Sequence, residues 1–140
     1  MNVIFQEDLS NVNWTEMKQV YQSVGWNKHT EEIIQSVFQA SNVIVIVRDE
    51  LRIVGFGRAL TDGVFNAAIY DVVVDKHYQG KGIAKQIIGH LTRRLEGVSC
   101  IHLISTTGNE AFYEKMGFQK LKTGMARYLN SSLAMEYLEK

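Results

Sequence analysis

The sequence has little cysteine, no excess of either charge and no long apolar run. Cys100 is its single cysteine, so no disulfide can form within the chain. The 15 basic and 15 acidic residues balance, which argues against a general nucleic-acid binder. The longest apolar run, at residues 42–47, is much shorter than the roughly 20 residues of a membrane helix. The first ten residues lack the pattern of a secretion signal. We therefore expect a cytoplasmic protein with no nucleic-acid or membrane partner.

The chain has the size and composition of one ordinary globular domain. Its 140 residues match the usual domain length and leave no room for a second sizeable core. Hydrophobic residues make up 46% of the chain, which is typical of soluble globular proteins. We therefore expect one domain that spans residues 1–140.

The first half of the sequence predicts one strand, two helices and then three strands. Residues 3–6 can form a short strand, and Asn13 and Thr30 are suitable caps for two helices whose apolar residues recur at helical spacing. Residues 43–47, 53–60 and 65–74 are rich in β-branched side chains and are separated by polar turns. This pattern is typical of an antiparallel meander.

The second half adds a crossover that makes the predicted sheet mixed. Residues 82–96 have a helical apolar stripe, and residues 99–105 look like a buried strand, on which Cys100 would be inert. A strand that follows another through a helix normally pairs with it in parallel. A short helix at residues 110–115 should end at Gly117, and residues 118–122 and 125–129 suggest a closing hairpin. The expected fold class is α/β with a mixed sheet.

The loop between the third meander strand and the following helix carries the most information about function. Gly80 and Gly82 allow a tight turn and close approach of a ligand, and free N–H groups at the helix start can bind phosphate oxygens. A dinucleotide-binding loop would need a third glycine where Lys85 stands. A nucleotide-triphosphate loop fails because Lys81 precedes Gly82. A tight turn without any ligand remains the alternative.

Two motifs together resemble the signatures of the GNAT superfamily of N-acetyltransferases. The first is Gln79-x-x-Gly82-x-Ala84 after a Val-rich strand, and the second runs from Asn109 through Ala111-Phe112-Tyr113 to Gly117-Phe118. The resemblance covers nearly the whole chain. It is closest to the branch of the plastid-type serotonin (arylalkylamine) N-acetyltransferases, through residues 55–59, 62, 65–67 and 71–75 and the Gly124-Met125 pair.

The resemblance implies a GNAT-like acyl-CoA N-acyltransferase fold and an acetyl-CoA-dependent N-acetyltransferase, an acyltransferase that forms a ternary complex. Tyr113 would be the acid that protonates the leaving thiolate, or else a packing residue beside Phe112. Asn109 would cap the short helix, bond the pantetheine, or do both. The residues expected to hold acetyl-CoA are Val72, Val73, Val74, Gln79, Gly80, Lys81, Gly82, Ile83, Ala84, Lys85 and Asn109.

Asp71 is the candidate base that accepts the proton of the acceptor amine. An unpaired buried carboxylate would cost several kcal/mol inside this apolar strand, so Asp71 must face a cleft or a partner. The alternative is a structural pair with Arg58. Trp26, Tyr21 and Tyr128 could line an amine pocket, although packing in the core is the ordinary role of such residues.

Three functions remain open at this point. The first is acetylation of the primary amine of a small molecule, the second is acetylation of protein lysines or N-termini, and the third is acyl-CoA binding without catalysis. The four histidines and Cys100 lack the spacing of metal ligands, so we expect no metal. A homodimer is compatible with the sequence.

Overall fold

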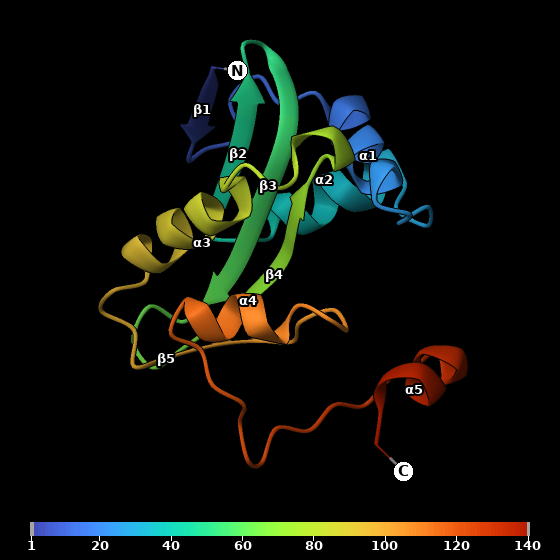
Figure 1. Cartoon of the computed structure of the whole chain (residues 1–140), viewed down its shortest axis with the longest axis vertical. Coiled ribbons are helices and arrows are strands. Elements are labelled where there is room, and N and C mark those ends of the chain that lie inside the picture. The colour runs from blue at the N-terminus through green and yellow to red at the C-terminus, as the bar shows by residue number, and fades with distance from the viewer. Residues whose placement is uncertain (1, 140) are drawn as a thin grey trace. The chain divides into compact units, whose positions relative to one another are not determined.

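A computed structural model describes residues 2–139, and Figure 1 shows the order of the elements. Two compact units follow one another along the chain, Met1–Thr106 and Thr107–Lys140. The expectation of one domain over residues 1–140 stays a prediction. The elements of the first unit are β1 (Val3–Gln6), α1 (Trp14–Ser23), α2 (Glu31–Gln39), β2 (Val43–Asp49), β3 (Arg52–Thr61), β4 (Asn66–Val74), η1 (Lys76–Tyr78), α3 (Ile83–Arg94) and β5 (Cys100–Leu103).

The first unit is built on a five-stranded mixed sheet in the order β1-β2-β3-β4-β5. Strands β1 to β4 pair antiparallel with their neighbours, and β5 pairs parallel to β4 after the α3 crossover. The predicted α/β fold with a meander and one parallel unit is therefore confirmed. Figure 1 shows α1 and α2 on one side of this sheet and α3 on the other.

Local capping sets the starts of the first two helices, as the sequence predicts. The Asn13 side chain accepts a hydrogen bond from the Glu16 N–H at 3.1 Å, and the Thr30 hydroxyl accepts one from the Ile33 N–H at 3.2 Å. Each bond satisfies a backbone donor that the first turn of a helix leaves free, and such a cap is typically worth about 1 kcal/mol.

Large apolar side chains fill the space between the sheet and the first two helices. The Phe38 and Phe56 rings meet edge to face with their centroids 5.4 Å apart. Burying a large apolar side chain contributes about 1.5–3 kcal/mol relative to leaving it in water. The buried cluster on this face consists of Met17, Val20, Tyr21, Ile34, Phe38, Ile44, Ile46, Ile53, Phe56 and Val73.

Glycines in β3 let α3 lie close against the opposite face. A Cβ atom on Gly57 would stand 2.7 Å from Ile87 Cγ2 and 3.2 Å from Leu91 Cδ1. Real Cβ atoms essentially never approach another atom within 3.0 Å, so the helix occupies space that any larger residue would need. Ile87 and Leu91 are fully buried in this contact. Strand β3 thus sets how near α3 comes to the sheet.

The last strand is shorter and more exposed than predicted. The sequence suggests a buried strand over residues 99–105, whereas β5 spans Cys100–Leu103 and none of its residues is buried. Cys100 is exposed, so the prediction that it lies on a buried strand is wrong, and its inertness stays a prediction. The physical reason is position, because β5 is the final strand of the sheet and its apolar residues pair with β4 on one side only.

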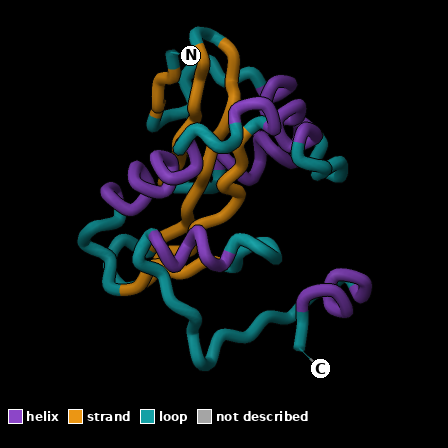
Figure 2. The backbone as a smooth tube through the Cα atoms, viewed as in Figure 1, coloured by secondary structure: helices purple, strands orange, loops and turns teal. Residues whose placement is uncertain are grey.

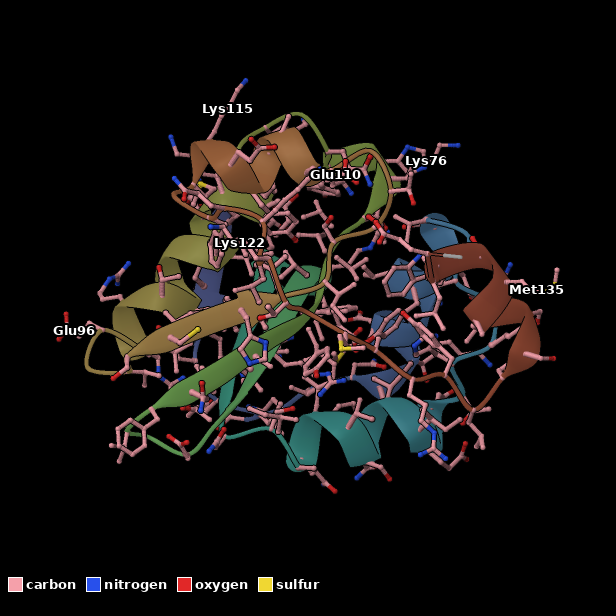
Figure 3. The ribbon with its side chains drawn as sticks, turned by 90° about the horizontal axis from the view of Figure 1, so that it is seen from below. Lys76, Glu96, Glu110, Lys115, Lys122 and Met135 are labelled. Atoms are coloured by element: carbon pink, nitrogen blue, oxygen red, sulfur yellow. The ribbon has the colours of Figure 1, made fainter. Side chains whose placement is uncertain are left out.

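The second unit contains the predicted short helix but not the predicted hairpin. Helix α4 (Glu110–Lys115) precedes Gly117, whose φ is 97°, and α5 (Ser131–Tyr137) begins after the cap Asn130. Residues 118–129 form a loop in Figure 2, so the hairpin prediction is wrong. An isolated two-stranded hairpin is marginal in water unless a face is buried. Here Met125 is 96% exposed, and Met135 in α5 extends outward in Figure 3.

Candidate functional site

Strand β4 has an open edge in its second half. Its pairs with β5 end at Ile69, which lies opposite Leu103, while its pairs with β3 continue to Val74. The Asp75 N–H donates to the Val54 carbonyl oxygen at 2.8 Å. Backbone groups alternate in direction along a strand, so those of Val73 also point toward β3. By this alternation the backbone groups of Val72 and Val74 point toward the open edge. Within residues 2–139, β5 supplies no pairing partner to them.

A β-bulge at Asp71 accompanies this opening. Phe56 pairs with Val73 and Arg58 pairs with Tyr70, so residues 71 and 72 together face the single Gly57. Asp71 has a φ of 51°, a left-handed conformation that a residue other than glycine rarely adopts. An extra residue of this kind bends a strand and redirects its side chains and backbone groups. The bulge therefore lies where β4 loses β5 as its partner.

The Asp71 carboxylate is held by two partners from different elements. Tyr21 in α1 donates its hydroxyl proton to Asp71 Oδ2 at 3.0 Å, and Arg58 in β3 places Nε 3.0 Å from the same oxygen. The Arg58–Asp71 pair that the sequence offered as an alternative is thus present. Both bonds end on Oδ2, so among the described residues Oδ1 receives no hydrogen bond. The Asp71 side chain is 16% exposed. Oδ1 is the oxygen left for an external donor.

Burial explains the chemistry of Tyr21. The Tyr21 side chain is 0% exposed, and its ring stacks on His29 with centroids 4.2 Å apart and on Trp26 at 5.8 Å. Burial, and then the negative charge of Asp71, raise the pKa of the Tyr21 hydroxyl far above its ordinary value. Tyr21 therefore stays protonated and donates to Asp71. Because the ring is fully covered, it does not form an open pocket wall, whereas Trp26 beside it is partly exposed.

The predicted glycine loop follows β4 after the single helical turn η1. Gly80 and Gly82 have φ values of 78° and 81°, which explains the need for glycine at both positions. A Cβ atom on either residue would meet nothing within 4 Å, so the loop borders open space. The side-chain amide of Gln79 donates to the Val74 carbonyl oxygen at 3.1 Å and ties the loop to the end of β4.

Helix α3 begins at this loop with free backbone donors. Gly82 is the N-cap, and the described structure shows no side-chain cap there. The N–H groups of Ile83, Ala84 and Lys85 are thus the first amides of a 12-residue helix, whose dipole favours a negative charge at this end. Lys81 and Lys85 are exposed beside them. These donors, the cations and the open β4 edge fit a long ligand with a diphosphate at one end.

Three predicted residues belong to the second unit. The Tyr113 ring packs against Phe112 at 5.0 Å and Phe118 at 6.0 Å between centroids, and burial raises the pKa of its hydroxyl above the ordinary 10.0. Asn109 occupies the N-cap position of α4 without a side-chain capping bond. Tyr128 also lies in this unit, where its ring stacks on Tyr137 at 6.0 Å. Asp71, Trp26 and the glycine loop lie in the first unit.

Sequence analysis did not place His29 near the site, and it named Arg58 only as a structural partner of Asp71. His29 stacks on Tyr21, and its Nδ1 atom is buried without a hydrogen-bond partner among the described residues. The only signal for His29 was its position in the same interhelix loop as Trp26. For Arg58, the signal was the need of a carboxylate in an apolar strand for a cation.

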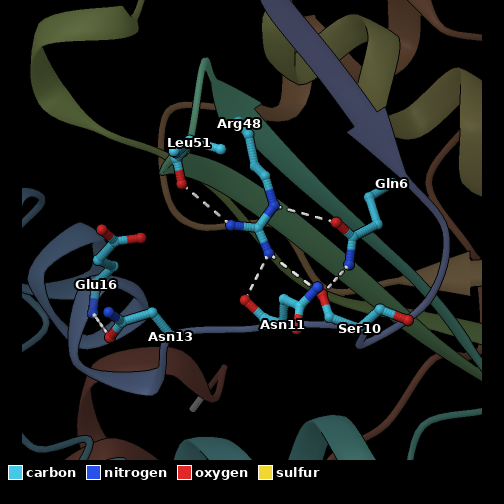
Figure 4. A pocket seen from close by; sticks show the side chains of 7 residues that line it. All are labelled: Gln6, Ser10, Asn11, Asn13, Glu16, Arg48 and Leu51. Carbon is cyan, nitrogen blue, oxygen red and sulfur yellow. Dashed lines mark hydrogen bonds between the residues drawn. The ribbon is translucent and has the colours of Figure 1, made fainter.

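The hollow in Figure 4 is a different feature from the glycine loop. It has a volume of about 350 Å³ and lies around Arg48, whose guanidinium donates to the carbonyl oxygens of Leu51 and Asn11 at 3.2 and 2.9 Å and to the Gln6 side chain. These bonds leave Arg48 occupied in holding loops together. Among the described residues no cluster of His, Cys, Asp and Glu is placed to hold a metal ion. None of the described helices combines the length and apolar character needed to cross a membrane.

Comparisons with known proteins give one consistent family. The family model described as "Acetyltransferase (GNAT) domain" matches residues 40–120. "Uncharacterized N-acetyltransferase ycf52" of Porphyra purpurea is 32% identical over 87% of this chain and 74% of its own length. "Serotonin N-acetyltransferase 2, chloroplastic" of Oryza sativa subsp. japonica is 33% identical over 73% of this chain and 54% of its own. A probable acetyltransferase structure from Staphylococcus aureus superposes with a TM-score of 0.81 at 22% identity, covering 92% of this chain and 99% of that one.

Proposed function

This chain is an N-acetyltransferase of the GNAT family, and we propose that it transfers the acetyl group of acetyl-CoA to the primary amine of a small molecule by direct attack in a ternary complex. The observation that carries the proposal is the open edge of β4 next to a glycine loop at a free helix start. An edge with free N–H and C=O groups can pair with an amide-containing arm, and the helix start can bind a diphosphate.

The backbone of β4 binds and orients the donor in this proposal. Val72 presents its N–H and C=O groups toward the open edge, and Val74 presents its N–H, since the Val74 carbonyl oxygen already accepts from Gln79. These groups can pair with the amides of the pantetheine arm. Val73 faces β3 and shapes the strand from the core side. An N–H on this edge can stabilise the negative charge that develops on the thioester oxygen as the amine attacks. The N–H groups of residues 80–85 bind the diphosphate, with Lys81 and Lys85 as nearby cations.

Asp71 is proposed to accept a proton from the acceptor amine, directly or through water. An alkylamine with a pKa near about 10 is mostly protonated at neutral pH and must lose a proton before it attacks. Tyr21 and Arg58 hold the carboxylate through Oδ2, which fixes its orientation and leaves Oδ1 for the amine. The contact with Arg58 also supports the structural alternative, so the two roles need a kinetic test.

Tyr113 is proposed to protonate the sulfur as the C–S bond breaks. The amine nitrogen forms the new C–N bond, its proton goes to Asp71 or solvent, and the thiolate takes the Tyr113 hydroxyl proton to leave as a thiol. Burial raises the pKa of Tyr113, so its hydroxyl is protonated at neutral pH and able to donate. Asn109 at the start of the same helix is proposed to bond the pantetheine arm.

The acceptor is proposed to be a small amine that contacts an aromatic surface. Trp26 is partly exposed beside the Tyr21 and His29 rings, and the Tyr21 hydroxyl bonds Asp71. Tyr128 is proposed as a further contact from the second unit. One similar protein is named a serotonin N-acetyltransferase, which supports an aryl-substituted amine. Acetylation of a protein lysine or N-terminus is the second candidate, and acyl-CoA binding without catalysis is the third.

Thiol release with a panel of acceptors tests these three candidates. We expect acetyl-CoA-dependent release of free thiol with an arylalkylamine or another small primary amine. Polyamine, amino-sugar and lysine-peptide acceptors complete the panel and serve as the comparison. Faster release with the peptide than with every small amine would favour protein acetylation. Binding of acetyl-CoA without release for any acceptor would favour the non-catalytic role.

We also propose that the enzyme works in a reducing compartment, with the cytoplasm as the expected site. The supporting observation is Cys100, a lone exposed thiol without a disulfide partner. Thiols of this kind persist where glutathione and thioredoxin keep proteins reduced.

A further inference from the structure

The turn between β2 and β3 contacts the segment that leads into the glycine loop at two points. Asp49 ends β2 and Arg52 begins β3, with residues 50 and 51 between them. The Tyr78 hydroxyl donates to Asp49 Oδ2 at 2.6 Å, and Arg52 Nη2 lies 3.4 Å from Asp75 Oδ2. Asp75 is the N-cap of η1, the single helical turn before Gln79, and Tyr78 is its last residue. Asp49 and Arg52, on either side of the β2–β3 turn, therefore both contact the segment that precedes the glycine loop.

The two contacts differ in what they hold. Asp75 is 3% exposed and already fixed, because its N–H bonds the Val54 carbonyl oxygen and its carboxylate caps η1 through the His77 N–H at 2.9 Å. The contact of Asp75 with Arg52 adds little to that, since the Arg52 side chain is 54% exposed. Tyr78 is different, because its hydroxyl reaches across to the end of another strand just before the loop turns at Gly80.

Electrostatics reinforce the contact between Asp49 and Tyr78. The hydrogen bond from Tyr78 lowers the pKa of the Asp49 carboxyl and raises the pKa of the Tyr78 hydroxyl, so one stays ionised and the other protonated near neutral pH. Such a charge-assisted bond is short and stronger than a neutral one. The Lys81 ammonium lies over the Tyr78 ring, 6.0 Å from its centroid, so the same side chain also faces a cation of the loop.

We propose that the Asp49–Tyr78 hydrogen bond is a positioning contact that holds the glycine loop ready for the diphosphate of acetyl-CoA. The inference rests on the proposed binding of acetyl-CoA at this loop. Two glycines with positive φ make the loop conformationally free, and a loop that must be ordered on binding loses affinity. Tyr78 precedes the first of these glycines by two residues, so fixing its ring limits where the loop can begin. Neither Asp49 nor Tyr78 needs to touch the ligand.

The test compares a donor that has the diphosphate with one that lacks it. Calorimetry with CoA and kinetics with acetyl-CoA and S-acetylpantetheine are measured for the parent, Tyr78→Phe, Asp49→Ala and Asp49→Asn. Tyr78→Phe keeps the ring beside Lys81 and removes only the hydroxyl. We expect Tyr78→Phe and Asp49→Ala to weaken CoA binding about five- to tenfold and to raise KM for acetyl-CoA at nearly constant kcat. Asp49→Asn keeps an oxygen acceptor and should recover part of the loss.

The acetylpantetheine arm separates positioning from general damage. The kcat/KM for S-acetylpantetheine should stay within about twofold of the parent in all three variants, because this donor does not use the loop. An equal loss with both donors, or unchanged CoA affinity in a folded Tyr78→Phe variant, would overturn the positioning role. Failure of the parent itself to bind CoA would instead overturn the proposed acetyl-CoA site. Thermal melting of each variant establishes that it is folded.

Discussion

Arg58 and Asp71 are bonded across adjacent strands at 3.0 Å although they are not partners in the strand register. Arg58 lies opposite Tyr70, and the bulge at residues 71 and 72 rotates the Asp71 side chain onto the same face. The Arg58 guanidinium also lies 5.0 Å from the centroid of the Tyr70 ring. The proposed base is thus part of the β4 bulge and is held there by Arg58. Replacing either residue should therefore alter the position of the other.

Replacing Asp71 tests whether its carboxylate accepts a proton. Asp71→Asn keeps the shape and one acceptor oxygen but removes the base, so we expect kcat to fall about 10²-fold near neutral pH. The deficit should shrink as the pH approaches the amine pKa near about 10, because free amine then becomes abundant. Measuring pH–rate profiles gives the fall in kcat and its dependence on pH. Acetyl-CoA affinity should stay unchanged.

Arg58→Gln is the matched control for the same ion pair. It removes the pair and leaves the carboxylate, so it should reduce stability while retaining more activity than Asp71→Asn. Identical rate profiles for the two variants would show that Asp71 acts only as a structural partner.

Changing Gly82 tests the anion site at the start of α3. Gly82→Glu places a negative side chain where the diphosphate is proposed to bind, and Gly82→Ala imposes the same positive-φ strain without the charge. We expect the glutamate variant to bind acetyl-CoA about tenfold or more weakly than the alanine variant. Isothermal calorimetry on both folded variants measures the difference. Equal affinities of the two variants would show that the diphosphate does not bind beside Gly82.

Tyr113→Phe isolates the proposed acid from its packing. The variant keeps the ring contacts with Phe112 and Phe118, so we expect a fall in kcat of roughly 10²-fold with little change in acetyl-CoA affinity. Because burial raises the pKa of Tyr113, the parent should lose activity through this group only above pH 10. Single-turnover rates of the parent and the variant show whether the chemical step itself is slowed.

Tyr137→Phe serves as the control in the same unit, since it also deletes a single phenolic hydroxyl. Its rate should match that of the parent. If Tyr113→Phe also transfers acetyl groups at the parental rate in both assays, water or another group supplies the proton.

Gly57 provides a prediction about stability. Gly57→Ala should destabilise the fold by about 1–3 kcal/mol, because its Cβ would overlap Ile87 in a closely packed contact. Gly89→Ala in α3 is the control, since that Cβ would meet nothing within 4 Å and alanine favours a helix by about 0.5–1 kcal/mol. Urea unfolding of the two variants should therefore give shifts of opposite sign.

Local signals in the sequence predicted those features that depend on neighbouring residues. The caps Asn13 and Thr30 act within three residues of their own positions, and Gly80 and Gly82 are required by the φ of the turn they occupy. The mixed sheet followed from β-branched runs and one helical crossover. The family motifs favoured an acyl-CoA loop, because glycine spacing alone did not distinguish a ligand-binding loop from a plain tight turn.

Features that depend on long-range placement were beyond the sequence. The hydroxyl of Tyr21 meets Asp71, fifty residues away in sequence, because α1 packs over the bulge of β4. The exposure of Cys100 follows from its place on the last strand, which a run of apolar residues does not reveal. Residues 118–122 and 125–129 around Thr123-Gly124 suggest a hairpin, but the structure has no strand there. A two-stranded hairpin is marginal in water unless one of its faces is buried, and the sequence does not show whether that happens.

The close approach of α3 to Gly57 couples the packing of the sheet to the position of the helix start. Its buried middle rests on β3, and its first turn carries the amides that face the proposed diphosphate. A bulkier residue under the middle would tilt the helix and shift those amides, even though the loop sequence is intact. Random mutagenesis selected for weaker donor binding should therefore yield substitutions in the middle of the sheet as well as in the loop. Restoring such variants would call for a smaller residue at position 87 or 91, rather than any change among the groups that meet the ligand.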